Sequence, residues 1–217
     1  MKRPRQSSLT YRKMVIGVPS SNKNKYYKQM KKAVLLIFFL ISSNLFAQKP
    51  CDYTTNITDS IGTYKSTKEY IIYEKNFAGN TNYIFYSLAL TDGMPTLNIN
   101  FIQKSKEFIK ANCFDKNSKL FLQLNNGKII TLLHIDKENC GTMVRDDKGY
   151  DNRILTANFM FLKGTFEDLK TSPVNMMRIK YLTDIEDYVI KKQFQSELDN
   201  LIYEPESYFI NYLHCIE

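Results

Sequence analysis

The sequence predicts a mainly β protein built from antiparallel hairpins, which form a sandwich or an open barrel with one short helix and two C-terminal helices packed on it. Three observations predict this class. Apolar and polar residues alternate over short segments, which is the period of half-buried strands. Glycine-containing pairs such as Asn126-Gly127 and Asp92-Gly93 separate these segments at hairpin spacing. Helical periodicity is confined to three short segments of the chain.

The clearest hairpin signal is KLFLQLNNGKIITLLHI, from Lys119 to Ile135. A two-residue type I′ turn suits Asn126-Gly127, because both of its central residues need positive φ. The opposed pairs are then Leu124 with Ile129, Leu122 with Thr131, and Leu120 with Leu133. The other face is only partly polar, so we expect a second sheet or a helix to cover it; its residues are Phe121, Gln123, Ile130, Leu132 and His134.

The remaining strands follow the same pattern. A turn at Asp92-Gly93 joins Tyr83–Leu90 to Thr96–Ile102, and a turn near Asp184 divides the segment 174–190. We expect Glu69–Lys75 to pair with the strand after Gly79-Asn80, and Arg153–Leu162 to be one more strand. The pattern predicts about eight strands in all.

Three helices are expected. Thr165 is a suitable N-cap for a short helix at Phe166–Lys170. The segments Gln193–Ile202 and Glu206–Ile216 are predicted as two more, and apolar residues of the last one fall on one stripe. Cys215 is expected to fasten that last helix to the sheet.

A secretory signal is predicted at residues 30–47. Two lysines precede an apolar run of nine residues, Ala33–Ile41, and a short polar break follows before Ala47. The run is shorter than the roughly 20 residues that cross a bilayer, so we expect cleavage after Ala47 or Gln48, an uncleaved anchor being the alternative. The sequence thus predicts an exported protein, periplasmic or extracellular, without a permanent membrane span.

Residues 1–29 are predicted to be a non-native upstream extension, from a mis-set start codon or a long basic leader, with Met30 as the start. The whole chain has 30 basic and 22 acidic residues, but residues 1–47 contain ten basic and no acidic ones. Residues 48–217 therefore carry 20 basic and 22 acidic side chains, a formal charge of −2. Nucleic-acid binding is excluded, because it requires a clustered excess of Lys and Arg.

Residues 48–217 are long enough for one β-rich domain with a core, and no Pro- or Gly-rich linker divides them. All four cysteines of the chain lie here. An even number in an oxidising compartment favours two disulfides, and the spacings do not match zinc-site patterns. The candidate disulfide cysteines are Cys51, Cys113, Cys140 and Cys215.

No catalytic, cofactor or metal site is predicted. The sequence lacks GxSxG, HExxH, a phosphate loop and GxGxxG. Of its two histidines, His134 is expected to be a lining or rim residue and His214 a structural one. The loop 146–152 offers oxygens for calcium but is better explained as a solvated turn. The acidic residues at 184–187 are attributed to turn solubility, since successive strand residues point to opposite faces.

One family resemblance can be stated from the C-terminal pattern LKTSPVNMMRIKYLTDIEDYVIKKQF, the terminal SYFINYLHCIE, and LQLNNGKIITLLHIDKENC at 122–140. Together with the signal ending LFAQ, these resemble a group of uncharacterised secreted proteins of Bacteroidota. The resemblance implies no activity. It implies pairing of Cys140 with Cys215, which leaves Cys51 with Cys113, and pairing of Cys113 with Cys140 is the alternative.

Three functions from different classes fit the sequence. The first is a non-catalytic exported module that binds a protein or an envelope component. The second is a small-ligand carrier with a cleft between the sheet and the C-terminal helices. The third is a hydrolase, which requires His134 beside a nucleophile and an orienting carboxylate. Fifteen tyrosines without a tryptophan fit a stacking surface for sugars or peptides, but packing in a sheet explains them better.

Overall fold

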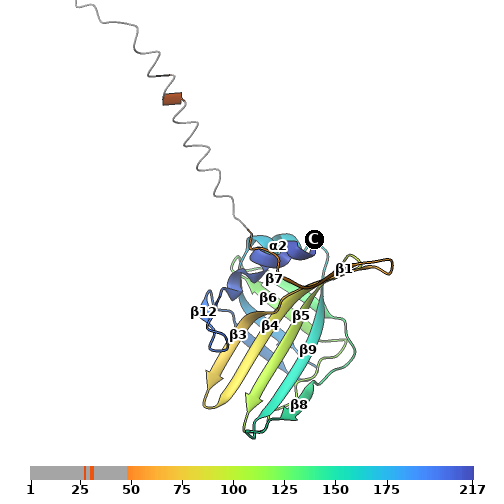
Figure 1. Cartoon of the computed structure of the whole chain (residues 1–217), viewed down its shortest axis with the longest axis vertical. Coiled ribbons are helices and arrows are strands. Elements are labelled where there is room, and N and C mark those ends of the chain that lie inside the picture. Colours follow the sequence, from red (N-terminus) through yellow and green to blue (C-terminus); the bar gives the residue numbers. More distant parts are fainter. Residues whose placement is uncertain (1–26, 28–29, 32–47) are drawn as a thin grey trace, which may run out of the picture. The chain divides into compact units, whose positions relative to one another are not determined.

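Residues 48–217 contain thirteen strands and four short helical segments (Figure 1). The computed structural model describes Tyr27, Met30, Lys31 and residues 48–217. The predicted upstream extension and signal peptide lie outside the described residues, apart from those three. Gln48–Glu217 forms one compact unit. No helix in the described residues has the length and apolar character needed to cross a membrane.

The strands take the following bounds: β1 Tyr53–Thr58, β2 Thr63–Thr67, β3 Tyr70–Phe77, β4 Asn80–Thr91, β5 Met94–Ser105, β6 Lys119–Leu124, β7 Ile129–His134, β8 Thr142–Arg145, β9 Asp151–Phe161, β10 Val174–Lys180, β11 Ile185–Val189, β12 Phe194–Gln195 and β13 Ile202–Tyr203. The helical segments are α2 Phe166–Thr171, the 3-10 turn η1 Pro205–Ser207, α3 Tyr208–Tyr212 and the 3-10 turn η2 Leu213–Ile216.

Eleven of the strands form one antiparallel sheet in the order β1-β2-β4-β5-β9-β7-β6-β10-β11. Strand β3 pairs with β4 along the same edge as β2. Strand β8 likewise pairs with β9 along the same edge as β7. Strands β12 and β13 form a separate small hairpin. The predicted class, mainly antiparallel β with few helices, is confirmed.

The sheet folds over on itself, so that β4 and β10 face each other across the core. The Tyr86 hydroxyl on β4 lies 2.7 Å from the Met177 sulfur on β10. The rings of Tyr73 on β3 and Tyr188 on β11 are 5.1 Å apart. We call η1, α3 and η2, from Pro205 to Ile216, the C-terminal segment. Helix α2 and this segment contact each other at one end of the sheet (Figure 1). The largest fully buried side chains are Tyr86, Tyr208, Phe114, Phe159, Ile84, Leu88, Leu97, Ile99, Leu120, Leu122, Leu124 and Leu132.

The turn between β4 and β5 has the predicted form. Asp92 has φ 50° and Gly93 has φ 81°, and Thr91 lies opposite Met94. Two central residues with positive φ match the right-handed twist of the paired strands. The prediction of a two-residue turn at this place is confirmed.

The register predicted for the hairpin of β6 and β7 is wrong by one residue. Its loop has three residues, Asn125 to Gly127, with Gly127 at φ 85°, and the Leu124 amide donates to the Lys128 carbonyl at 2.9 Å. Leu122 therefore lies opposite Ile130, and Leu120 opposite Leu132. A slip of one residue moves a whole strand face. Three residues that the two-residue turn would have placed on the same face as Phe121 and Gln123 thus join the core: Ile130, Leu132 and His134.

Contacts with the segment before β10 explain the longer loop. The Asn125 amide donates to the Pro173 carbonyl at 2.9 Å, and the Asn126 amide donates to the Ser172 hydroxyl at 3.3 Å. Both donors are committed to a segment almost fifty residues further along the chain. Asn125 is therefore held in the loop instead of extending β6.

One of the three predicted helices is wrong. Phe166–Thr171 is helical as expected, although the Thr165 hydroxyl donates to the Leu162 carbonyl rather than capping the helix. Gln193–Ile202 instead contains the β12–β13 hairpin, in which Phe194 stacks on Tyr203 at 5.9 Å. A positive φ of 61° at Asn200 is incompatible with a continuing helix. The last segment is helical but divided into η1, α3 and η2.

Two disulfides are present, and their pairing differs from the one that the resemblance implied. Cys51 pairs with Cys215 and Cys113 pairs with Cys140, so the alternative for Cys113 is the one observed. An antiparallel bridge between Phe114 and Asn139 places the second pair side by side. The first pair ties the start of the unit to its C-terminal segment, where the Tyr53 hydroxyl donates to the Cys215 carbonyl at 2.8 Å. Cys215 therefore fastens that segment to the residues before β1.

Candidate functional site

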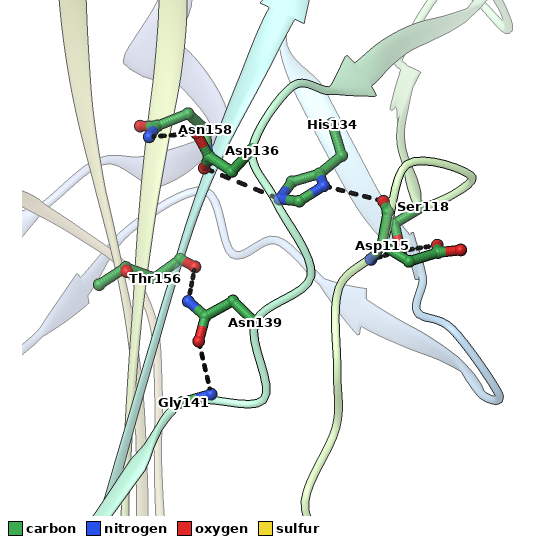
Figure 2. Close-up of polar contacts among 8 residues, drawn as sticks. All are labelled: Asp115, Ser118, His134, Asp136, Asn139, Gly141, Thr156 and Asn158. Atoms are coloured by element: carbon green, nitrogen blue, oxygen red, sulfur yellow. Dashed lines mark hydrogen bonds and ion pairs between the residues drawn. The ribbon is translucent and has the colours of Figure 1, made fainter.

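His134, the residue on which the hydrolase hypothesis depended, is buried in the core instead of lining a rim. Its side chain is 0% exposed and its ring stacks on Phe114 at 5.3 Å. Figure 2 shows Nδ1 directed at the Asp115 carbonyl, 2.8 Å away, and Nε2 directed at the Asp136 carboxylate, 3.7 Å away. The second distance exceeds that of a hydrogen bond.

No nucleophile accompanies this histidine. The Ser118 hydroxyl, which lies nearby in Figure 2, donates to the Asp115 carboxylate at 3.0 Å and accepts from the Asp115 amide at 2.9 Å. Within the described residues, no hydroxyl or thiol forms a hydrogen bond with the imidazole of His134. A serine or cysteine nucleophile needs such a bond to a base, so this geometry does not support acyl-transfer chemistry.

Polar side chains near His134 instead form hydrogen bonds with the backbone of β9. They do so at the residues that lie between the part of β9 paired with β8 and the part paired with β7. The Asp136 carboxylate accepts from the Asn158 amide at 2.8 Å, and Asn139 donates to the Thr156 carbonyl at 3.0 Å (Figure 2). Gly141, at φ 71°, lies so close to β9 that an added Cβ would be 2.4 Å from the Ile154 carbonyl. Side chains thus take the place of a strand along this edge, which is a structural role.

The two acidic segments also have structural partners. The Asp146 carboxylate accepts from the Lys148 and Tyr150 amides, at 3.0 and 2.9 Å, and from the Lys104 ammonium at 2.8 Å. The hydrogen bond from Lys104 is the largest cause that holds the pKa of Asp146 below its ordinary value. In the segment 184–187, Asp187 receives both hydrogen bonds of a bidentate pair from Arg178 on the neighbouring strand.

A cleft of about 250 Å³ lies between the β2–β3 connection, the β12–β13 hairpin and the C-terminal segment. We call it the tyrosine cleft, because four tyrosines line it: Tyr70, Tyr203, Tyr208 and Tyr212. The rest of its lining is Asp52, Thr67, Lys68, Glu69, Leu201 and Ile202. This is the place, between the sheet and the C-terminal helices, where the carrier hypothesis expected a cleft.

Tyr70 is the centre of the aromatic lining. Its ring centroid lies 4.9 Å from that of Tyr203, 5.3 Å from Tyr208 and 5.4 Å from Tyr212. Separations in this range are typical of favourable edge-to-face and offset pairs. The Tyr70 hydroxyl also accepts from the Glu204 amide at 2.7 Å, which fixes the β12–β13 hairpin against β3. The cleft therefore has a rigid aromatic wall.

Tyr208 is the innermost of these side chains, with 2% of its surface exposed. Its hydroxyl is buried and forms no hydrogen bond with a described residue; Thr67 lies beside it, but without hydrogen-bond geometry. Burial raises the pKa of Tyr208, so the hydroxyl stays protonated and able to donate. Because this hydroxyl is buried, a ligand in the cleft meets the ring of Tyr208 and not its hydroxyl.

Carboxylates and lysines surround the aromatic wall. Lys68 pairs with Asp52 at 3.1 Å, and Lys49 pairs with Glu204 at 2.5 Å. The Glu69 carboxylate accepts from the Asn100 side chain at 3.2 Å and is largely exposed. Since each lysine already has a carboxylate partner, Glu69 adds a net negative charge beside the cleft.

Sequence reasoning expected a cleft near the C-terminal helices but did not identify the residues that line it. The tyrosine content was a signal, but it gave no location, because Tyr70 lies more than 130 residues from the other three tyrosines of the cleft. The predicted helix at Gln193–Ile202 also hid the hairpin that forms one side of the cleft.

No protein-family model, curated protein or solved structure matches this chain.

Proposed function

We propose that this protein is an exported, non-catalytic binding module, and that its tyrosine cleft binds a saccharide segment of an envelope component. The observation that carries the proposal is the wall of the cleft, in which four tyrosines lie together around Tyr70. Export is supported by the signal-like segment at residues 30–47 and by two disulfides, which persist in oxidising compartments.

The chemistry of the lining suits a sugar. Tyrosine presents a rigid apolar ring against which the C–H face of a pyranose can pack. Asp52 and Glu69 supply carboxylate oxygens that accept from sugar hydroxyls, and Lys68 supplies a donor. Apolar area combined with a few converging polar groups is the usual composition of a ligand site.

The size of the cleft favours a segment of a larger molecule over a carried small ligand. Sites that enclose drug-sized ligands have volumes of roughly 300–1,000 Å³, whereas the tyrosine cleft has about 250 Å³. It can hold about one sugar ring while the rest of a chain stays in solvent. The hydrolase alternative is not supported by the surroundings of His134.

Saturation-transfer NMR tests the proposal. The purified protein is mixed in turn with each member of a panel of soluble oligosaccharides and with an envelope polysaccharide fraction. We expect signal transfer to at least one sugar, and at least a tenfold loss of affinity in Tyr203→Ala, which removes a ring from the rim. Tyr150→Ala is the matched control, because Tyr150 lies in the β8–β9 turn, where Lys104 covers its ring. Absence of transfer to every sugar, or equal binding by the Tyr203 variant, refutes the proposal.

Tyr208→Phe is a second control. The substitution removes a buried hydroxyl that a ligand in the cleft does not reach, so the melting temperature should stay unchanged or rise. Affinity for the sugar should equal that of the parent. A tenfold loss of affinity in this variant would show that the ligand contacts the Tyr208 hydroxyl and would contradict the described wall of the cleft.

A further inference from the structure

Cys51, Cys215 and His214 form a compact group where the start of the unit meets its C-terminal segment. His214 Nε2 lies 3.2 Å from the Cys51 sulfur and 3.7 Å from the Cys215 sulfur. These three atoms all lie within 4.8 Å of one another. Two sulfurs and an imidazole nitrogen are the ligand types that zinc prefers. In the oxidised protein the two sulfurs are bonded to each other, so they are not available to a metal.

We infer that reduction of the Cys51–Cys215 disulfide creates a zinc site formed by the two thiolates and His214 Nε2. Zinc–sulfur and zinc–nitrogen bonds of about 2.3 and 2.05 Å at the tetrahedral angle place sulfur and nitrogen about 3.6 Å apart. The two observed sulfur–nitrogen distances, 3.2 and 3.7 Å, lie on either side of this value. Only the two sulfurs need to separate, to about 3.8 Å, for three tetrahedral positions to be occupied.

A dithiol can act as the reductant of the Cys51–Cys215 disulfide. The dithiol gives two electrons and two protons, the bond between the Cys51 and Cys215 sulfurs breaks, and the dithiol becomes a disulfide. Zinc then displaces one proton from each cysteine thiol into solvent and takes the lone pair of neutral His214 Nε2. The resulting site is neutral overall, with two thiolates opposite one divalent cation.

The surroundings of His214 leave its ring free for this role. Its Nδ1 is buried without a hydrogen-bond partner, and the two sulfurs are the only hydrogen-bond neighbours of its Nε2 among the described residues. No fourth Cys, His, Asp or Glu ligand atom belongs to the group within residues 48–217. Cys51 and His214 are partly exposed, so water can fill the fourth position.

Zinc would replace the disulfide as the link between the two ends of the unit. Cys51 and Cys215 are 164 residues apart, and no other covalent bond joins their segments within the described residues. A reduced chain that holds zinc keeps the segment before β1 against η2. It also keeps both thiols protected until they are oxidised.

The test uses the full chain, reduced with a phosphine under anaerobic conditions, freed of reductant and titrated with cobalt chloride. We expect one cobalt per chain, with thiolate-to-cobalt absorption and the visible bands of tetrahedral cobalt, and loss of both on adding zinc chloride. His214→Ala should weaken binding at least tenfold. The Cys113→Ala/Cys140→Ala double variant is the matched control and should bind as the parent does.

Alkylation gives a second measurement that does not depend on colour. Zinc should slow the reaction of Cys51 and Cys215 with iodoacetamide at least tenfold, measured by peptide mass spectrometry, and leave Cys113 and Cys140 unprotected. The inference is overturned by the absence of thiolate-to-cobalt absorption, by equal binding in His214→Ala, or by loss of binding in the Cys113/Cys140 variant. A reduced chain whose near-ultraviolet circular dichroism stays that of an unfolded protein in the presence of zinc also overturns it.

Discussion

Removing the Cys51–Cys215 disulfide should destabilise the protein more than removing the Cys113–Cys140 disulfide. The reason is the length of chain that each bond closes, 164 residues for the first and 27 for the second. A longer closed loop removes more conformational entropy from the unfolded chain. The two double alanine variants, Cys51→Ala/Cys215→Ala and Cys113→Ala/Cys140→Ala, compare the bonds without leaving reactive thiols.

The loop-entropy relation gives the magnitudes. It predicts a loss of about 5.2 kcal/mol in the free energy of unfolding for the longer loop and about 3.6 kcal/mol for the shorter one. A domain of this size loses roughly 3 °C of melting temperature per kcal/mol. The expected decreases are therefore about 15 °C and about 10 °C. The larger loss is comparable to the whole stability of many single domains.

Urea unfolding followed by circular dichroism measures both variants in the same buffer, and calorimetry gives the melting temperatures. The transition must stay two-state, with the same dependence on urea concentration, for the free energies to be compared. The reasoning is refuted if the two variants lose equal stability, or if the Cys113/Cys140 variant is the less stable one. Non-reducing peptide mapping of the parent should give a Cys51–Cys215 cross-link and a Cys113–Cys140 cross-link.

Two further predictions concern the loops. Gly127→Ala should lower the free energy of unfolding by about 1–2 kcal/mol in urea titration, because Gly127 has φ 85° and a Cβ is unfavourable there; an unchanged value would contradict the positive φ at Gly127. Asp146 has a pKa below its ordinary value, chiefly through the hydrogen bond from Lys104. Its contribution to stability is complete above the unfolded pKa of about 3.8 and is lost as the pH falls through the lower folded pKa. Asp146→Asn should therefore reduce the dependence of stability on pH below pH 4, measured by urea titration at several pH values, and a slope equal to that of the parent would contradict this account.

Local signals were sufficient where the structure depends on neighbouring residues. The β4–β5 turn needs only two residues that accept positive φ, and Asp92-Gly93 supplies them next to alternating strands. The β6–β7 loop carries an equally clear Asn126-Gly127 pair, yet its register is shifted by one residue. The difference lies in hydrogen bonds from Asn125 and Asn126 to residues 172 and 173, which no local pattern reveals.

The strands that the sequence pattern did not predict are largely exposed to solvent. Strand β8 is exposed along its whole length and β1 along most of it, so neither shows the alternation that identifies a half-buried strand. Leu198, Leu201 and Ile202 gave Gln193–Ile202 the composition of an amphipathic helix, but all three are exposed around the β12–β13 hairpin. The disulfide pairing likewise depends on which segments meet in space. Cys113 and Cys140 meet because of the bridge between Phe114 and Asn139.

The tyrosine cleft and the Cys51–Cys215 bond depend on the same meeting of the two ends of the unit. Asp52, which lines the cleft, directly follows Cys51, and Tyr212 precedes Cys215 by three residues. The hydroxyl of Tyr53, two residues after Cys51, donates to the Cys215 carbonyl. Loss of the disulfide releases Asp52 and Tyr212 from a fixed separation, so the cleft should lose rigidity before the sheet does. A zinc ion at Cys51, His214 and Cys215 would hold these two residues together in the reduced chain. The disulfide thus stabilises the fold by closing a long loop, and it also positions two of the segments that line the cleft, at Asp52 and at Tyr212.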